Sequence, residues 1–237
     1  RLQDSGAKLL VTTSELRKRI AHILPDLPDL ENVLIVNKLG RDETPVAEGD
    51  LQYDDLMAAT SDDFDIESTS MYDYSIMHYT SGTTGKPKGA VHRHLAVAQQ
   101  YATGKWVLDI HPDDIYWCTA DPGWATGTSY GITAPWTNGI TQLIYEGPSR
   151  ASDWYALVEK HKVSVWYTAP TAIRMLMKAG QEVAKRYDHS KLRYINSVGE
   201  PLNPEVMKKW EDGTGLTIYD GYGQTETVLL VANYQCL

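Results

Sequence analysis

The residues best suited to chemistry form one short stretch, residues 79–89, which reads YTSGTTGKPKG. It places four Ser and Thr hydroxyls, three glycines and two lysines within eleven residues. Hydroxyls and backbone amides donate hydrogen bonds to phosphate oxygens, glycine lets the backbone approach those oxygens closely, and lysine supplies positive charge. The composition of this stretch therefore predicts a loop that binds a polyphosphate.

The spacing of this loop differs from that of the P-loop, G-x-x-x-x-G-K-[ST]. Five residues after Gly82 the chain has Pro87, and Lys86 is followed by this proline rather than by Ser or Thr. Strand-like runs at residues 75–78 and 90–92 flank the loop. These features predict a loop that joins two strands over a nucleotide. Composition alone leaves a flexible hairpin without a ligand as the alternative.

The composition of the whole chain limits the classes of function. With 237 residues, 42% hydrophobic and 22% charged, the sequence is an ordinary globular one that can bury a sizeable core. Its net charge of −9 argues against a general nucleic-acid binder. Two widely separated cysteines, Cys118 and Cys236, fit a reducing compartment, and we expect a cytoplasmic protein without a membrane span. The oligomeric state is left open.

Strands and helices that alternate along the chain must position the loop. Short apolar or β-branched runs predict strands at residues 9–13, 33–36, 115–119, 141–145, 163–167, 193–197 and 216–219. Helical patterns follow Ser14 and cover residues 53–59, 95–107, 154–161, 171–179 and 204–210, with further start signals at Ser152 and at Asn203-Pro204. This alternation predicts an α/β fold with a mostly parallel sheet. Ligands of such sheets bind beyond the carboxyl ends of the strands.

Three segments that follow predicted strands carry residues suited to binding a flat or charged ligand. Residues 119–127 place Trp124 between two glycines, although a core tryptophan is an equally good interpretation. Residues 197–202 form a Gly-Glu-Pro turn, for which an ordinary β-to-α connection is the simpler interpretation. Residues 219–227 hold Tyr222 between glycines, followed by the hydroxyl of Thr225 and the carboxylate of Glu226. Carboxylates near phosphates often bind Mg²⁺, whereas a single glutamate is by default solvated.

Two other kinds of site are not predicted. His92 and His94 would lie on one face of a strand, but no third ligand follows at a suitable spacing, so we do not expect a metal site there. The sequence also lacks a G-x-S-x-G pattern, which argues against a serine nucleophile.

Taken together and in this order, the motifs resemble those of the AMP-forming adenylating enzymes, which include acyl-CoA synthetases, aryl-CoA ligases, luciferases and peptide-synthetase adenylation domains. The phosphate loop, Gly199-Glu200-Pro201 and residues 222–226 carry the resemblance. It runs from about residue 75 to the C-terminus, with a weaker likeness over residues 8–36. Within the family, residues 117–124 and 166–174 are most similar to acetyl-, propionyl- and medium-chain acyl-CoA synthetases.

The resemblance implies an acid–thiol ligase that works in two steps. A carboxylic acid and ATP give an acyl-adenylate and pyrophosphate, and coenzyme A then displaces AMP. The cofactors and partners implied are ATP or AMP, Mg²⁺, coenzyme A and a small carboxylic acid. The fold implied is part of the family's N-terminal domain, with the Gly-rich loop between two strands.

The resemblance also assigns expected roles to individual residues. The catalytic residues would be Lys86, Thr225 and Glu226, with Glu226 as the metal ligand. The residues expected to bind the nucleotide are Thr80, Ser81, Gly82, Thr83, Thr84, Gly85, Lys86, Gly199, Glu200, Pro201, Asp220, Gly221, Tyr222 and Thr225. The residues expected to line the acyl pocket are Trp124, Ala125, Thr126, Val198 and Gly223.

One departure from the family pattern concerns the size of the acid. Acetyl-CoA synthetases usually carry two tryptophans where this chain has Tyr222-Gly223, and the second closes the pocket. Gly223 and the small Ala125 therefore predict a larger pocket, and each methylene buried in it is worth about 0.8 kcal/mol. We expect a propionate-to-medium-chain, branched or aryl acid. The alternatives are an acetyl-CoA synthetase proper and a non-catalytic nucleotide-binding module.

The domain organisation expected from the sequence is that of one fragment. Residues 1–70 would form a strand-helix-strand unit with a polar connection, and residues 71–237 the nucleotide- and acyl-binding core. The family's C-terminal domain, which carries a lysine needed for adenylate formation, would lie beyond residue 237. We therefore expect the isolated chain to be inactive.

Overall fold

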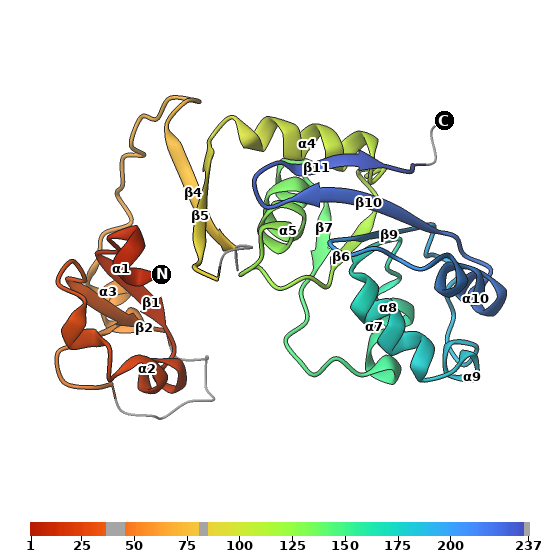
Figure 1. The fold of residues 1–237 in the computed structure, drawn as a ribbon, viewed down its shortest axis with the longest axis horizontal. Coiled ribbons are helices and arrows are strands. Elements are labelled where there is room, and N and C mark those ends of the chain that lie inside the picture. The colour runs from red at the N-terminus through yellow and green to blue at the C-terminus, as the bar shows by residue number, and fades with distance from the viewer. Residues whose placement is uncertain (37–45, 81–84, 235–237) are drawn as a thin grey trace. The chain divides into compact units, whose positions relative to one another are not determined.

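The computed structural model describes residues 1–36, 46–80 and 85–234 (Figure 1). These divide into two units, each described by itself. The first comprises residues 1–36, 46–69 and 85–89, and the second comprises residues 70–80 and 90–234.

A small parallel sheet organises the first unit, in the order β1-β2-β3. Its elements are α1 (Leu2–Ser5), β1 (Leu9–Thr12), α2 (Ser14–Ile20), a 3-10 turn (Leu24–Asp26), β2 (Asn32–Ile35), β3 (Leu51–Gln52) and α3 (Tyr53–Ala59). Leu10 pairs with Val33, and Leu34 with Leu51. The predicted strand-helix-strand order is confirmed.

The start of α2 differs from the expectation by one residue. Thr13, not Ser14, is the N-cap, and its Oγ1 accepts a hydrogen bond of 3.3 Å from the Leu16 N–H. The helix ends at Ile20, so Ile23 lies beyond it. A partly buried ion pair of 2.8 Å between Arg17 and Asp50 ties α2 to the segment before β3.

A six-stranded sheet organises the second unit, in the order β11-β10-β9-β8-β6-β7, and β4 and β5 form a separate two-stranded sheet. The strands are β4 (Tyr74–Thr80), β5 (Lys88–Arg93), β6 (Ile115–Cys118), β7 (Thr141–Leu143), β8 (Val165–Thr168), β9 (Tyr194–Val198), β10 (Ile218–Gln224) and β11 (Val228–Ala232). The pairs in the six-stranded sheet are parallel except that of β10 with β11. The mostly parallel α/β fold and the position of the Gly-rich loop between two strands are confirmed.

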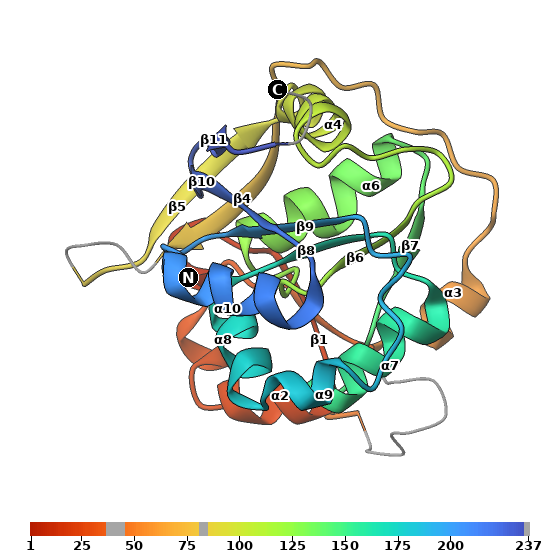
Figure 2. The ribbon, with the colours of Figure 1, turned by 90° about the vertical axis from the view of Figure 1, so that its right-hand side faces the viewer.

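Helices cover both faces of the large sheet, as Figure 2 shows. They are α4 (Ala96–Trp106), α5 (Ala125–Thr128), α6 (Ala134–Thr137), α7 (Ala151–His161), α8 (Pro170–Lys178), α9 (Gln181–Ala184) and α10 (Pro204–Thr214), with a π-helical segment Ser129–Thr133 between α5 and α6. α7, α8 and α10 lie on one face, and α4 and α6 lie on the other.

Residues that alternate along each strand supply two separate cores. Trp117 and Trp166 point to the face of α7 and α8, where their rings stack with centroids 5.2 Å apart. Tyr116, Val165 and Tyr167 point to the opposite face, toward α4 and α6. Because both faces are covered, the central strands are buried along their whole length, which explains their continuous apolar character.

Three expectations about local structure are wrong. Residues 125–137, expected as loop at their start, form a continuous helical segment that includes a π-helical turn. β10 does not end at Tyr219 but continues through the expected loop to Gln224, because β11 pairs with it. Ser152 lies inside α7 rather than capping it. Asn203, in contrast, caps α10 as expected, by accepting a hydrogen bond of 2.9 Å from the Glu205 N–H.

Of the described helices, none combines the length and the apolar character that crossing a membrane requires.

Candidate nucleotide and acyl site

Polar residues follow the parallel strands at one edge of the large sheet. β6, β8, β9 and β10 run in the same direction, so their carboxyl ends meet at this edge. The side chain of Thr119, just after β6, lies 2.6 Å from that of Thr168 at the end of β8. In the ladder, Thr168 pairs with Ser197, which pairs with Asp220. A row of hydroxyls and one carboxyl thus crosses the edge where a ligand is expected.

The Gly199-Glu200-Pro201 turn follows β9 directly. Gly199 has φ of +99°, a conformation that only glycine adopts without strain, which explains the glycine at the point where the chain leaves the sheet. Two side chains of α8 hold Glu200: the Thr171 hydroxyl donates to it over 3.3 Å, and the Arg174 guanidinium forms an ion pair with it. The turn is therefore fixed against α8.

Asp220 lies one strand away from this turn. Its neighbour in β10, Gly221, pairs with Val198, the residue before Gly199. One carboxylate oxygen of Asp220, Oδ1, is buried without a hydrogen-bond partner among the described residues. Burial raises the pKa of Asp220, although the Gly221 N–H partly offsets this by donating to the carboxylate. A buried oxygen without a partner at the sheet edge is suited to accept a hydrogen bond from a ligand.

Tyr222 and Gly223 continue along β10 and differ sharply in their surroundings. The Tyr222 side chain is 56% exposed, and its hydroxyl accepts a hydrogen bond of 3.1 Å from Gln224. Its ring is therefore available for stacking on a flat ligand. Gly223 lies against backbone: a Cβ there would lie 2.0 Å from the carbonyl oxygen of Val228. The glycine is required by the β10–β11 pairing, whatever the size of any pocket.

Thr225 and Glu226 lie in the turn that joins β10 to β11. The Thr227 N–H closes the turn by donating to the Gln224 carbonyl over 3.2 Å. Glu226 is exposed, and it makes no ion pair or hydrogen bond with any described residue. Its carboxylate is thus free to bind a cation.

The expected acyl residues belong to the segment after β6 and to β9. Trp124 is the N-cap of α5 and is 66% exposed, so it is not a core tryptophan. The Thr126 hydroxyl lies 2.9 Å from that of Tyr167, which ties the start of α5 to β8. Val198 is buried in the core beneath α4 and α6. Ala125, the first residue of α5, is partly buried.

The phosphate loop is described only in part. Ser81, Gly82, Thr83 and Thr84 lie outside the described residues. Thr80 ends β4, Gly85 has φ of +84°, and Lys86 is exposed. The structure therefore brings together the Gly199–Pro201 turn, Asp220 and Gly221, and it ties Thr126 to the same sheet. It does not relate Lys86 to them.

Sequence reasoning missed the side chains that hold these segments in place. Arg174 and Thr171 hold Glu200, while His92 and Gln99 engage backbone carbonyls of the turn that carries Thr225. The position of Arg174 one helical turn after Thr171, on the helix before β9, was a weak signal for the first pair. The second pair is distant in sequence from its partners and left no local signal.

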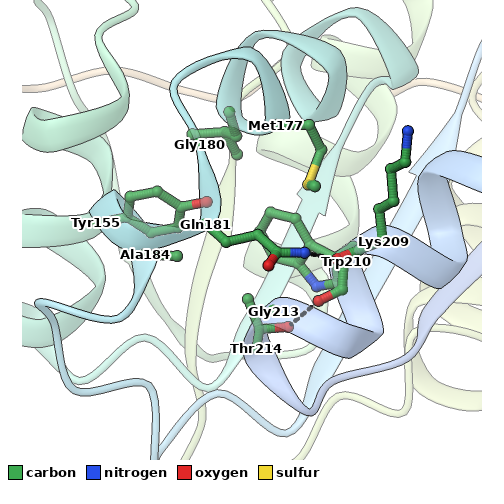
Figure 3. A pocket seen from close by; sticks show the side chains of 10 residues that line it. Tyr155, Met177, Gly180, Gln181, Ala184, Lys209, Trp210, Gly213 and Thr214 are labelled. Atoms are coloured by element: carbon green, nitrogen blue, oxygen red, sulfur yellow. Dashed lines mark hydrogen bonds between the residues drawn. The ribbon is translucent and has the colours of Figure 1, made fainter.

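Two hollows in the second unit are not the expected site. One, of about 390 Å³, lies beside β6 and β7 and is lined by Thr119, Asp121 and Trp154 among others, but by none of the five expected acyl residues. The other lies between α8, α9 and α10, against Tyr155 and Trp210 (Figure 3). Its volume of about 10 Å³ suits a single water molecule rather than a substrate.

The only cysteine described, Cys118, ends β6. Burial raises the pKa of its thiol to about 12, so the thiol stays protonated and is a poor nucleophile at neutral pH. Acyl transfer through this cysteine is therefore disfavoured.

Comparison with known proteins gives a consistent result. The sequence model described as "AMP-binding enzyme" matches residues 1–236. The chain is 48% identical to the acetyl-coenzyme A synthetase of Bacillus subtilis, over all of this chain and 41% of the relative. It is 40% identical to the acetyl-coenzyme A synthetase of Methanothrix thermoacetophila, over 96% of this chain and 37% of the relative. The chain thus spans about two fifths of the length of these relatives.

Solved structures are similar as well. An acyl-CoA synthetase of Brucella canis superposes on all of this chain and 42% of its own with a TM-score of 0.89 at 34% identity. An anthranilate CoA ligase in complex with anthranoyl-AMP superposes on 98% of this chain and 43% of its own, with a TM-score of 0.86 at 26% identity.

Proposed function

Because the chain belongs to the AMP-binding enzyme family of AMP-forming acid–thiol ligases, we propose that it supplies the nucleotide- and acyl-binding part of an acyl-CoA synthetase. In the proposed reaction a carboxylate oxygen attacks the α-phosphorus of ATP, which forms an acyl-adenylate and releases pyrophosphate. The coenzyme A thiol then attacks the acyl carbon and AMP leaves. The observation that carries the proposal is the convergence of the Gly199–Pro201 turn, Asp220 and Gly221 on one edge of the parallel sheet.

The residues of the sheet edge are suited to bind AMP and its acyl ester. The Gly199–Pro201 turn and the exposed ring of Tyr222 offer flat surfaces for adenine, and the free Asp220 Oδ1 can accept a hydrogen bond from its amino group. In this proposal Thr225 contacts the α-phosphate. Lys86 and the hydroxyls of the Gly-rich loop contact the β- and γ-phosphates.

Glu226 fits a magnesium ion, because its exposed carboxylate is an oxygen ligand that no described residue engages. Mg²⁺ is commonly bound through one or two carboxylates together with phosphate oxygens. When bound, the ion would offset the negative charge of the phosphates. The remaining work of the site is positioning and electrostatic stabilisation, which need no covalent protein intermediate.

We propose acetate or another short acid as the carboxylic acid substrate. The relatives at 38–48% identity are named acetyl-coenzyme A synthetases, which favours a short acid over the larger acids that Gly223 led us to expect. The backbone around Gly223 further weakens the case for a larger acid, because a Cβ at this position would clash with the Val228 carbonyl oxygen and the strand pairing alone explains the glycine. Ala125 remains the one observation that favours a larger acid.

The test uses the intact protein with Mg·ATP, coenzyme A and a series of acids. We expect release of AMP and pyrophosphate that depends on the acid, with kcat/KM highest for acetate or propionate. Release of ADP would identify a phosphotransferase, and binding without turnover would identify a non-catalytic module. A higher kcat/KM for hexanoate or benzoate than for acetate would instead support the larger acyl pocket predicted from the sequence.

A matched pair of variants tests the proposed role of Glu226. Glu226→Gln should lower acid-dependent ATP–pyrophosphate exchange by about 10²-fold. Glu205→Gln, on α10, changes an exposed glutamate that pairs with Lys209, so exchange should be unchanged. Equal exchange rates for both variants would refute the proposed role of Glu226 as a metal ligand.

A further inference from the structure

The turn that carries Thr225 and Glu226 is held by side chains from two elements far away in sequence. The Nε2 atom of His92, on β5, lies 2.6 Å from the Thr225 carbonyl oxygen. Gln99, on α4, donates through its Nε2 to the carbonyl of Thr227 over 3.2 Å and to that of Leu229 over 2.9 Å. Three backbone carbonyls of residues 225–229 are thus engaged from outside the hairpin.

The chemistry of a carbonyl oxygen settles the direction of the His92 bond. Such an oxygen accepts hydrogen bonds and cannot donate, so Nε2 of His92 must carry the proton. His92 is itself supported by His78, whose ring lies edge-on to it with the centroids 6.1 Å apart. His78 is 9% exposed, so the pair forms a partly buried connection between the two-stranded sheet and the turn.

The end of the turn needs external support because the backbone of Val228, the first residue of β11, is strained. Val228 has φ of +57°, a left-handed conformation in which a β-branched residue is an outlier. Such conformations persist only where the surrounding structure holds them. The two carbonyls that Gln99 engages belong to Thr227 and Leu229, the residues on either side of Val228.

Gln99 acts from a rigid element. Thr103, one turn later on α4, accepts or donates a hydrogen bond of 2.8 Å with the Tyr130 hydroxyl. The neighbouring Gln100 is buried and donates to Ser129 over 3.1 Å. α4 is therefore fixed against the π-helical segment, and it can hold the turn in one place.

We propose that His92 and Gln99 are positioning residues that fix the turn bearing Thr225 and Glu226 during adenylate formation, an inference that rests on the proposed function. Neither side chain is expected to touch ATP. His92 acts through the carbonyl of Thr225, and Gln99 acts through those of Thr227 and Leu229. Both thereby hold the turn whose Thr225 and Glu226 are proposed to contact the α-phosphate and Mg²⁺. Phosphoryl chemistry that depends on position is sensitive to displacements of about 1 Å, which can cost on the order of 10²-fold in rate.

The test compares His92→Leu, which removes the donor, with His92→Gln, which can still donate to the Thr225 carbonyl. Gln99→Met removes both donors of Gln99 at similar length. His94→Leu is the matched control, because His94 lies two residues further on and its side chain makes no hydrogen bond, ion pair or ring contact with a described residue. The readouts are kcat and KM for acid-dependent ATP–pyrophosphate exchange by the intact protein, with Tm for each variant.

We expect His92→Leu and Gln99→Met to lower kcat by about tenfold and to raise KM for Mg·ATP, because the first removes the side-chain donor from one carbonyl and the second from two. KM for the acid should stay unchanged, His92→Gln should recover most of kcat, and His94→Leu should match wild type. If His92→Leu does not fold, the other two variants test the proposal, since both keep the bulk of the original side chain. Gln99→Met should then still lower kcat, and His92→Gln should still keep most of it.

Two results would overturn the inference. Wild-type kcat in both His92→Leu and Gln99→Met would show that the turn needs no clamp. A fall in Tm and kcat that His92→Gln does not reverse would show a general structural role. Failure of the proposed function itself is distinguishable, because the wild-type protein would then show no acid-dependent exchange at all.

Discussion

Gly223→Ala should destabilise the protein because backbone occupies the space that a side chain needs at this position. A Cβ there would lie 2.0 Å from the Val228 carbonyl oxygen, 2.7 Å from its carbon and 3.1 Å from the Leu229 Cα. Real Cβ atoms essentially never come closer than 3.0 Å. No rotamer change relieves a clash with backbone, so β10 and β11 must move apart by about 1 Å.

The cost of this movement can be estimated from two contributions. Overpacking that forces a backbone shift costs about 1–3 kcal/mol. The shift also weakens the ladder where Gly223 pairs with Leu229, at about 1 kcal/mol for each hydrogen bond lost. We therefore expect a loss of about 3 kcal/mol in the free energy of unfolding.

Gly221→Ala is the matched control on the same strand. A Cβ at this position would first meet the end of the Leu229 side chain at 2.9 Å, and its next contacts are at 3.5 and 3.8 Å. A flexible side chain can rotate away, and alanine also restricts the unfolded chain, which stabilises by about 0.4–1 kcal/mol. The net effect should lie within about 1 kcal/mol of wild type.

Urea unfolding of the intact protein measures both variants, and hydrogen exchange of the β10 and β11 amides locates the effect. We expect Gly223→Ala to shift the unfolding midpoint and to lower protection in this hairpin. Gly221→Ala should do neither. Equal stability of the two variants would refute the backbone explanation for Gly223, and the glycine would again be best explained as an open wall of the acyl pocket.

Two further predictions concern charged side chains. Burial alone would raise the pKa of Asp114, but hydrogen bonds led by that of Arg193 outweigh it and lower the pKa below 3.8. The carboxylate therefore stabilises the fold above pH 3.8, and this stability is lost as the pH falls through the lowered pKa that Asp114 has in the folded protein. The Tm difference between wild type and Asp114→Asn should therefore narrow below about pH 4. Arg174→Met should raise KM for ATP by about tenfold by releasing Glu200, whereas the exposed Arg186→Met should not; equal KM values would contradict this role.

Most strands of the large sheet could be predicted because they are short apolar runs. Residues 163–167 become β8 at Val165–Thr168, and residues 193–197 become β9 at Tyr194–Val198. The boundaries shift because hydrophobicity reports burial, while a strand is defined by its pairing. Val163 is fully buried, yet it precedes the ladder.

The wrong secondary-structure predictions concern segments whose backbone conformation depends on contacts with residues distant in sequence. The sequence from Asp220 to Gln224 is rich in glycine and tyrosine, which predicts a loop, but pairing with β11 makes it strand. Residues 125–137 contain glycine, proline and several threonines, which disfavour a helix, yet they pack as one under α4. Local propensity was overridden in both places by contacts distant in sequence.

The candidate site shows the same division. The rule that ligands bind beyond the carboxyl ends of strands pointed to the segments of Glu200 and Asp220, and the resemblance assigned both residues to the nucleotide. Asp220 lies within β10 rather than after it. The side chains that fix them, such as His92 and Arg174, come from other elements. No pattern in one sequence links His92 to a carbonyl 133 residues away.

The three acidic residues of the candidate site, Glu200, Asp220 and Glu226, differ in whether a neighbouring group compensates their negative charge. This difference supports their proposed roles. The charge of Glu200 is compensated by Arg174, so the turn can lie against adenine without presenting a net negative charge. Burial raises the pKa of Asp220 and disfavours its charged form, which suits a hydrogen bond to a neutral base. Glu226 is exposed and is compensated by no described residue. In the proposed site an uncompensated carboxylate would repel the phosphates of ATP, and a Mg²⁺ ion between the two would offset this repulsion.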